Sequence, residues 1–100
     1  MRFINKNNFA TFQKNVTVSG TPVQLDTTIV DDGVSFVVKA KRANTGVITV
    51  GNSSANALNT GTGHFALQAG QSIELQVTNT NLVWIDSTVS GEGVEVVLEY

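Results

Sequence analysis

The chain contains no cysteine among its 100 residues, and only one proline, one methionine and one tryptophan. The absence of cysteine excludes disulfide bonds, thiolate zinc sites and cysteine nucleophiles. The length leaves no room for separate substrate and cofactor domains. Because a chain of this size buries only roughly 60 to 65% of its extended surface on folding, its stability must come from core packing or from partners.

Charge is also scarce, with 14% charged residues and a net charge of -2, against about 25% in an average domain. The first 42 residues carry six bases and three acids, 6 - 3 = +3, and the rest carries five acids and no base. This polarity fits a subunit that meets its neighbours head to side, an acidic outer face, or two halves that mix within one domain. Nucleic-acid binding needs a basic stripe with stacking aromatics, so we expect no nucleic-acid partner.

Long apolar runs are missing as well. No segment approaches the roughly 18 residues of a membrane span, and the opening residues lack the apolar core of a signal peptide. We therefore expect synthesis in a cytoplasm and no membrane partner.

Valine, isoleucine and threonine are abundant and together make 32 of the 100 residues, a bias that disfavours helices and favours strands. Apolar and polar residues alternate in short runs, separated by turn signals about every ten residues. We expect strands near residues 16–18, 23–29, 34–42, 47–51, 64–67, 71–78, 82–85 and 94–99. Eight such strands predict an all-β, antiparallel β-sandwich of jelly-roll type.

Residues 1–14 contain three of the five phenylalanines without a clean period, so we expect an N-terminal arm ahead of a β-sandwich domain at residues 15–100. Its apolar side chains need an apolar surface, on their own domain or on another subunit. The residues expected to contact a partner are Arg2, Phe3, Ile4, Lys6, Phe9, Phe12 and Lys14.

A second contact region is expected at residues 52–63, a polar stretch of twelve residues that indicates a long surface loop. Loops of this length in small domains are often functional. The side chains expected to be exposed there are Asn52, Ser53, Ser54, Asn56, Asn59 and Thr60.

A catalytic site is not indicated. His64 is the only histidine, so a hydrolytic triad needs it together with Asp86 and Ser53 or Ser54. No nucleophile-elbow motif surrounds either serine. We predict no catalytic residue and no enzymatic activity.

Metal and cofactor sites are not indicated either. Asp31, Asp32 and Glu92 lie in expected turns, but the D-x-D-x-D-G spacing of a calcium loop is absent. The stretch Gly61–Ala66 fits G-x-G-x-x-A, yet a dinucleotide site needs a strand before it and a helix after it. We predict neither a metal nor a cofactor.

The single tryptophan, Trp84, has two interpretations. It stands between Val83 and Ile85 on an apolar strand, which favours a core position. An exposed Trp84 or Tyr100 would instead offer a platform for sugar stacking.

Three stretches after Val34 form a recognisable succession: Asn44–Gly51, Leu67–Leu75 and Leu82–Asp86. This succession resembles that of small virion proteins of tailed bacteriophages. In that group an N-T-G-x-I-x-V-G segment precedes an L-x-P-G-x-S-I-x-L hairpin and an N-L-x-x-I-x-(D/V) strand. The resemblance covers about two-thirds of the chain and departs at Ala69, where proline is usual.

The resemblance implies a head-associated structural role such as capsid decoration, although tail and fibre-base components have similar small sandwiches. We therefore expect a non-enzymatic virion protein that binds the major capsid protein lattice or another virion protein, and that forms a homo-oligomer, with a trimer as first expectation. The alternative is a carbohydrate- or receptor-binding module of a phage tail or head fibre.

Overall fold

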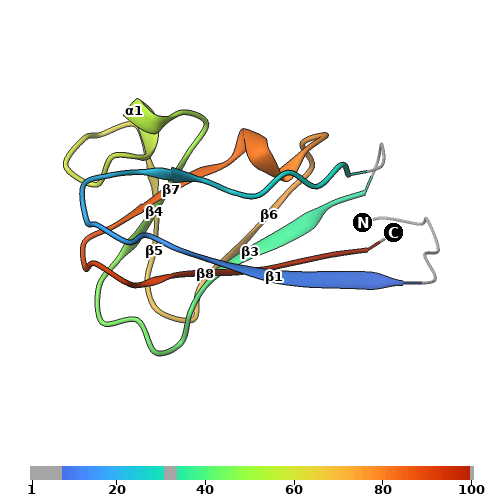
Figure 1. The fold of residues 1–100 in the computed structure, drawn as a ribbon, viewed down its shortest axis with the longest axis horizontal. Helices are drawn as coiled ribbons and strands as arrows, with labels where there is room; N and C mark the ends of the chain where they lie inside the picture. Colours follow the sequence, from blue (N-terminus) through green and yellow to red (C-terminus); the bar gives the residue numbers. More distant parts are fainter. Residues whose placement is uncertain (1–7, 31–33, 100) are drawn as a thin grey trace.

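The computed structural model describes residues 8–30 and 34–99. Figure 1 shows two antiparallel sheets packed face to face, with β1 and β8 side by side along one of them. The strands are β1 (Phe9–Asn15), β2 (Val23–Gln24), β3 (Phe36–Ala40), β4 (Ile48–Gly51), β5 (Phe65–Leu67), β6 (Ser72–Leu75), β7 (Trp84–Ser87) and β8 (Gly93–Glu99).

The strand order is β1-β8-β3-β6 in one sheet, here the β1 sheet, and β2-β7-β4-β5 in the other, the β2 sheet. The first strand therefore pairs with the eighth, the second with the seventh, the third with the sixth and the fourth with the fifth. A long hairpin rolled over itself gives this order, which is the arrangement of a jelly roll. The all-β sandwich that the sequence predicts is confirmed.

The core lies between the sheets, where inward side chains alternate with outward ones along each strand. Val38 on β3 pairs with Val96 on β8, and both are at most 1% exposed. Ile48 and Ile85 face them from the β2 sheet and are fully buried. Burying such side chains contributes about 1.5 to 3 kcal/mol each, which is the main stabilising term of the domain.

The N-terminal region differs from the prediction in its second half. Phe9–Asn15 form β1, an edge strand paired over its whole length with β8, whereas the sequence predicted an arm up to residue 14. Residues 1–7 of the predicted arm lie outside the described residues. The strand predicted at 16–18 is absent because Val16 is buried just beyond β1 and Val18 is 55% exposed.

Two further predictions change in detail. Only Val23–Gln24 of the strand predicted at 23–29 belong to a sheet, and Ile29 makes an isolated bridge with Asn79. The polar stretch 52–63 contains a short helix, α1 (Ser54–Ala57). A separate 3-10 turn, η1 (Thr80–Leu82), precedes β7. α1 packs against β4 and β7 on the outer face of the β2 sheet (Figure 1).

Candidate functional site

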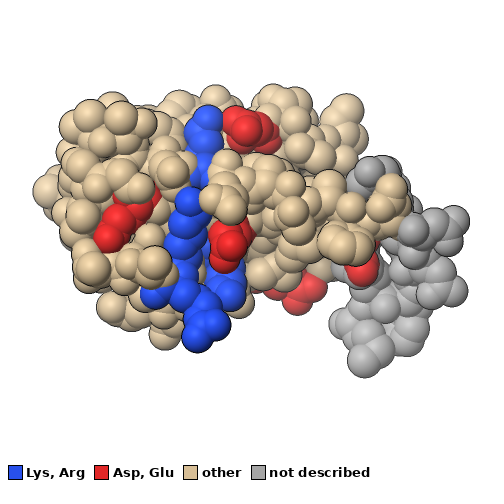
Figure 2. All heavy atoms as spheres, turned by 60° about the horizontal axis from the view of Figure 1, so that its bottom comes forward, with Lys and Arg blue, Asp and Glu red and all other residues tan. Residues whose placement is uncertain are grey.

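A band of positive charge crosses the outer face of the β1 sheet (Figure 2). Lys39 lies on this face because it pairs with the exposed Glu95 of β8, whereas Lys14 pairs with the buried Val94 and so belongs to the inward row of the edge strand β1. Just beyond β3, Lys41 donates from Nζ to Oδ1 of Asn15 at 2.8 Å. The basic residues of the described chain are Lys14, Lys39, Lys41 and Arg42.

On the outer face the basic side chains come from β3 and the residues just after it, whereas the neighbouring strand β8 carries Glu95 opposite Lys39. The two oppositely charged parts of the sequence are thus interleaved in one sheet. Lys14 is also paired, since its Nζ lies 2.9 Å from Oδ1 of Asp26. Both groups of this pair are partly exposed, so its contribution to stability is small.

An apolar pair adjoins the band on the same face. Val37 of β3 and Val97 of β8 are paired and face outward, and Val97 is 37% exposed. They line a depression of about 240 Å³ together with Thr11, Gln13, Lys39 and Glu95. The face therefore combines exposed apolar atoms with positive charge, as the core and rim of a protein interface do.

A larger hollow lies between the other edges of the sheets. It has a volume of about 430 Å³, and we call it the edge groove. Its lining residues are Val50, Gly51, Asn52, Phe65, Ile73, Glu74, Leu75, Val77, Leu82 and Val83.

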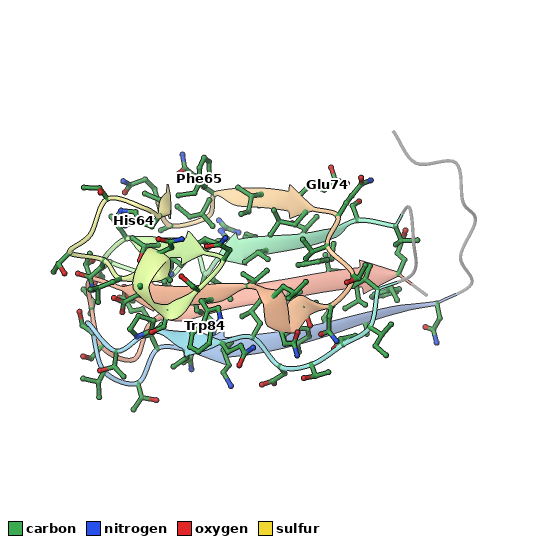
Figure 3. The ribbon with its side chains drawn as sticks, turned by 90° about the horizontal axis from the view of Figure 1, so that it is seen from above. His64, Phe65, Glu74 and Trp84 are labelled. Atoms are coloured by element: carbon green, nitrogen blue, oxygen red, sulfur yellow. The ribbon has the colours of Figure 1, made fainter. Side chains whose placement is uncertain are left out.

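The edge groove exists because β5 is too short to cover β6. β5 has three residues, so the inward side chains Ile73 and Leu75 of β6 remain only half-buried. Phe65 is 58% exposed and Leu82 is 49% exposed at its margin. Figure 3 shows Phe65 and Glu74 along this one edge of the molecule. Exposed, contiguous apolar surface of this kind marks interaction sites.

The charged residue among those lining the edge groove is Glu74. The hydroxyl of Ser35 donates to Oε2 of Glu74, which fixes the carboxylate beside the groove. The groove thus offers apolar surface with negative charge at its rim.

Asp86 is a fully buried carboxylate on β7. Its Oδ1 accepts from the backbone N–H groups of Gly20 at 3.0 Å and Ser87 at 2.8 Å. Its Oδ2 accepts from the backbone and side-chain nitrogens of Asn59 at 2.8 and 2.9 Å. Four donors satisfy an acceptor-only group, so Asp86 links two loops to the β2 sheet.

The residues of the imagined triad are not brought together in a catalytic arrangement. Nδ1 of His64 lies 3.1 Å from the carbonyl oxygen of Leu58, and Oγ of Ser53 accepts from the backbone N–H of Asn56 as the cap of α1. Asp86 instead contacts Asn59 and Gly20. Within residues 8–30 and 34–99, no group of three or more histidine, aspartate or glutamate side chains is placed to hold a metal ion.

Glu92 has a structural role in the turn before β4. Its carboxylate accepts from the backbone N–H of Thr45 at 2.7 Å, from the hydroxyl of Thr45 at 2.9 Å and from the backbone N–H of Gly46 at 2.8 Å. The backbone donors of Thr45 and Gly46 hold the pKa of Glu92 below its usual value. Asp31 and Asp32, which the sequence also places in a turn, lie outside the described residues.

The arm residues predicted to bind a partner fall into three groups. Arg2, Phe3, Ile4 and Lys6 are outside the described residues. Phe12 packs against the hydrophobic core from β1, so this side chain is used within the domain. Phe9 is 65% exposed, and Lys14, on the inward row of β1, is half-buried and paired with Asp26.

The loop residues are also divided. Asn52, Ser54, Asn56 and Thr60 are exposed. Ser53 caps α1, and Asn59 is half-buried because it donates to Asp86 and to the carbonyl oxygen of Ser87. Asn59 is therefore an anchor of this segment to β7 and not a loose loop residue.

Trp84 is neither buried in the core nor fully exposed. It is half-buried on the outer face of the β2 sheet, where Gln24 and Gly51 are its cross-strand neighbours. Figure 3 shows it apart from Phe65. The sequence favours a core position for Trp84, but its neighbours Val83 and Ile85 occupy the core instead and are 4% and 0% exposed.

Sequence reasoning missed the edge groove and the basic band. The groove depends on how β4 and β5 of one sheet pack against β6 of the other, and the band depends on the place of β3 beside β8. In the described part of the chain, no helix is long and apolar enough to span a membrane. No family model, curated protein or solved structure matches the chain.

Proposed function

We propose that the chain is a non-enzymatic structural subunit of a tailed-bacteriophage virion that decorates or cements the capsid by binding the major capsid protein lattice. The observation that carries this proposal is the outer face of the β1 sheet, where the basic band adjoins the exposed pair Val37 and Val97. Such a face suits an acidic protein surface with apolar centres. The phage context is supported by the motifs at Asn44–Gly51 and Leu67–Leu75.

The rest of the described surface agrees with a binding role. Two well hydrogen-bonded acidic groups, Asp86 and Glu92, hold loops of the domain in place. His64 likewise contacts backbone within its own segment. Fold alone does not decide function, because jelly rolls serve in viral capsids and in lectins alike.

Binding to purified particles tests the proposal. The full chain is incubated with capsids that lack it, and bound protein is measured by cosedimentation at several salt concentrations. The double variant Lys39→Gln, Lys41→Gln should bind about tenfold more weakly and depend less on salt, since two charges at the rim of an interface are lost. The control Thr62→Glu, Gln76→Glu changes the net charge equally at exposed positions elsewhere and should bind as the unaltered chain does.

Two outcomes count against the proposal. Equal weakening by both double variants would show that net charge alone matters and that the basic band is not the contact. Absence of the chain from purified particles of its source, by mass spectrometry and microscopy, would remove the virion role itself.

The second candidate is a carbohydrate- or receptor-binding module, and the placement of Trp84 favours it. A half-exposed indole beside the exposed amide of Gln24 is a possible stacking platform for a sugar ring. Tryptophan fluorescence during titration with oligosaccharides tests this candidate. A saturable shift in emission that is lost in Gln24→Ala would support it over capsid binding.

A further inference from the structure

We propose that residues 1–7 of one copy bind in the edge groove of a neighbouring copy. This inference rests on the assembly role proposed above, but it concerns a contact between copies of the chain that needs no capsid.

The edge groove is part of the core that its own sheet does not cover. Ile73 and Leu75 point toward the interior from β6, yet β5 begins only at Phe65, opposite Val50, and they remain half-buried. The margin adds the exposed side chains of Phe65 and Leu82. Covering such surface removes apolar area from water and is therefore favourable, so an apolar segment has a reason to bind there.

Residues 1–7 have the complementary chemistry. The segment MRFINKN contains Met1, Phe3 and Ile4, and it carries Arg2 and Lys6 with no acidic residue. The groove is apolar, and its charged lining residue is Glu74. An apolar, basic segment therefore matches both the surface and the charge of the groove.

The topology favours the groove of a neighbour over that of the same copy. β1 and β6 are the two opposite edges of the β1 sheet, so β8 and β3 separate them. Crossing this sheet takes about 14 Å at roughly 4.8 Å per strand, which is about four of the seven residues at roughly 3.4 Å each. A copy placed with its β6 edge beside the β1 edge of the next receives the whole segment without that crossing.

Each copy then donates a segment at one edge and accepts one at the other. Such a head-to-side contact is heterologous and produces a closed ring when the rotation between copies closes. The expected trimer is one such ring.

Sedimentation velocity of the full chain, without capsids, gives the first test. The unaltered chain should be an oligomer, whereas the double variant Phe3→Ser, Ile4→Ser and the groove variant Leu82→Lys should each sediment as the 10.6 kDa monomer. Matched controls are Asn5→Ser in the segment and Val18→Lys, which changes an apolar side chain of similar exposure outside the groove. Both controls should remain oligomers, and circular dichroism should show all variants folded.

Mixing the two defective variants tests the direction of the contact. The groove variant retains an intact segment and the segment variant retains an intact groove, so the mixture has one productive contact and should form a dimer. A groove-to-groove contact predicts instead that the segment variant oligomerises alone, and that outcome overturns the proposal.

Cysteine cross-linking separates contact between copies from contact within one copy, since the chain has no cysteine of its own. Oxidation of the double variant Ile4→Cys, Leu82→Cys should give a ladder of covalent oligomers on a denaturing gel, and Ile4→Cys, Val18→Cys should give far less. A fast-migrating cross-linked monomer would place the segment in its own groove and overturn the proposal. A monomeric unaltered chain at all concentrations would do the same.

The two proposals fail separately. Capsid binding that survives in the monomeric Leu82→Lys variant leaves the decoration role intact whatever the segment does. Oligomers that form normally in a chain that binds no capsid leave the contact between copies intact.

Discussion

Asn59 donates two hydrogen bonds to one oxygen of Asp86, from its backbone nitrogen at 2.8 Å and from its side-chain Nδ2 at 2.9 Å. The other oxygen of Asp86 accepts from Gly20 and Ser87. A single buried carboxylate therefore ties the segment after α1 and the turn before β2 to strand β7. This arrangement makes Asp86 a structural centre of the β2 sheet.

Asp86→Asn should destabilise the fold by about 3 kcal/mol, because the new amide turns an NH₂ donor toward N–H donors and leaves buried groups unsatisfied. Urea unfolding followed by circular dichroism measures the free energy of unfolding. The control is Asp26→Asn, whose side chain is 60% exposed and which should change that energy by less than about 1 kcal/mol. Equal effects of the two variants would contradict the role assigned to Asp86.

Gly93→Ala should disrupt the pairing of β1 with β8. A Cβ at Gly93 would meet the carbonyl oxygen of Lys14 and lie 2.7 Å from Cα of Asn15, and backbone atoms cannot move aside without breaking the ladder. We expect a loss of about 3 kcal/mol in the free energy of unfolding, at the upper end for overpacking. Gly61→Ala is the control, since its nearest atom lies at 3.4 Å, and it should be close to neutral in the same urea titration.

Two deletions at the N-terminus should distinguish the role of residues 1–7 from the role of strand β1. Removing residues 1–7 should change the free energy of unfolding of the monomer by less than about 0.5 kcal/mol. Removing residues 1–15 also removes β1 and the core contacts of Ala10 and Phe12, and it should abolish the cooperative thermal transition. A cooperative transition in the longer deletion would contradict the assignment of β1 to the domain.

The alternation of residues sufficed to predict the sandwich and most of its strands, because inward positions such as Val38 and Val96 are apolar wherever both sheets cover them. It failed for β1. The inward row of that edge strand runs through Ala10, Phe12 and Lys14, and pairing with β8 decides its conformation more than its own pattern does.

The candidate site was less predictable for the same reason. The groove results from the mismatch in length between β5 and β6, and the band from the outward side chains at the end of β3 beside β8. The sequence motifs suggest Asp86 only as a partner of His64. An acidic residue directly after the apolar run Leu82–Ile85 is, however, itself a signal of a buried, hydrogen-bonded carboxylate.

Glu92 should make the stability of the domain depend on pH in the acidic range. The backbone donors of Thr45 and Gly46 lower its pKa in the folded state relative to about 4.3 in the unfolded chain. A lowered folded pKa means that the stabilisation is present above the unfolded value and is lost as the pH falls through the folded one.

Glu92→Gln should therefore reduce stability at neutral pH and flatten the fall in urea midpoint between about pH 4.3 and lower values. The control Glu95→Gln removes a carboxylate from an exposed position of β8 and leaves the turn at residues 44–46 untouched, so it should keep the steep acid dependence. The same flattening in both variants would mean that general charge repulsion, and not the hydrogen bonds of Glu92, governs acid unfolding.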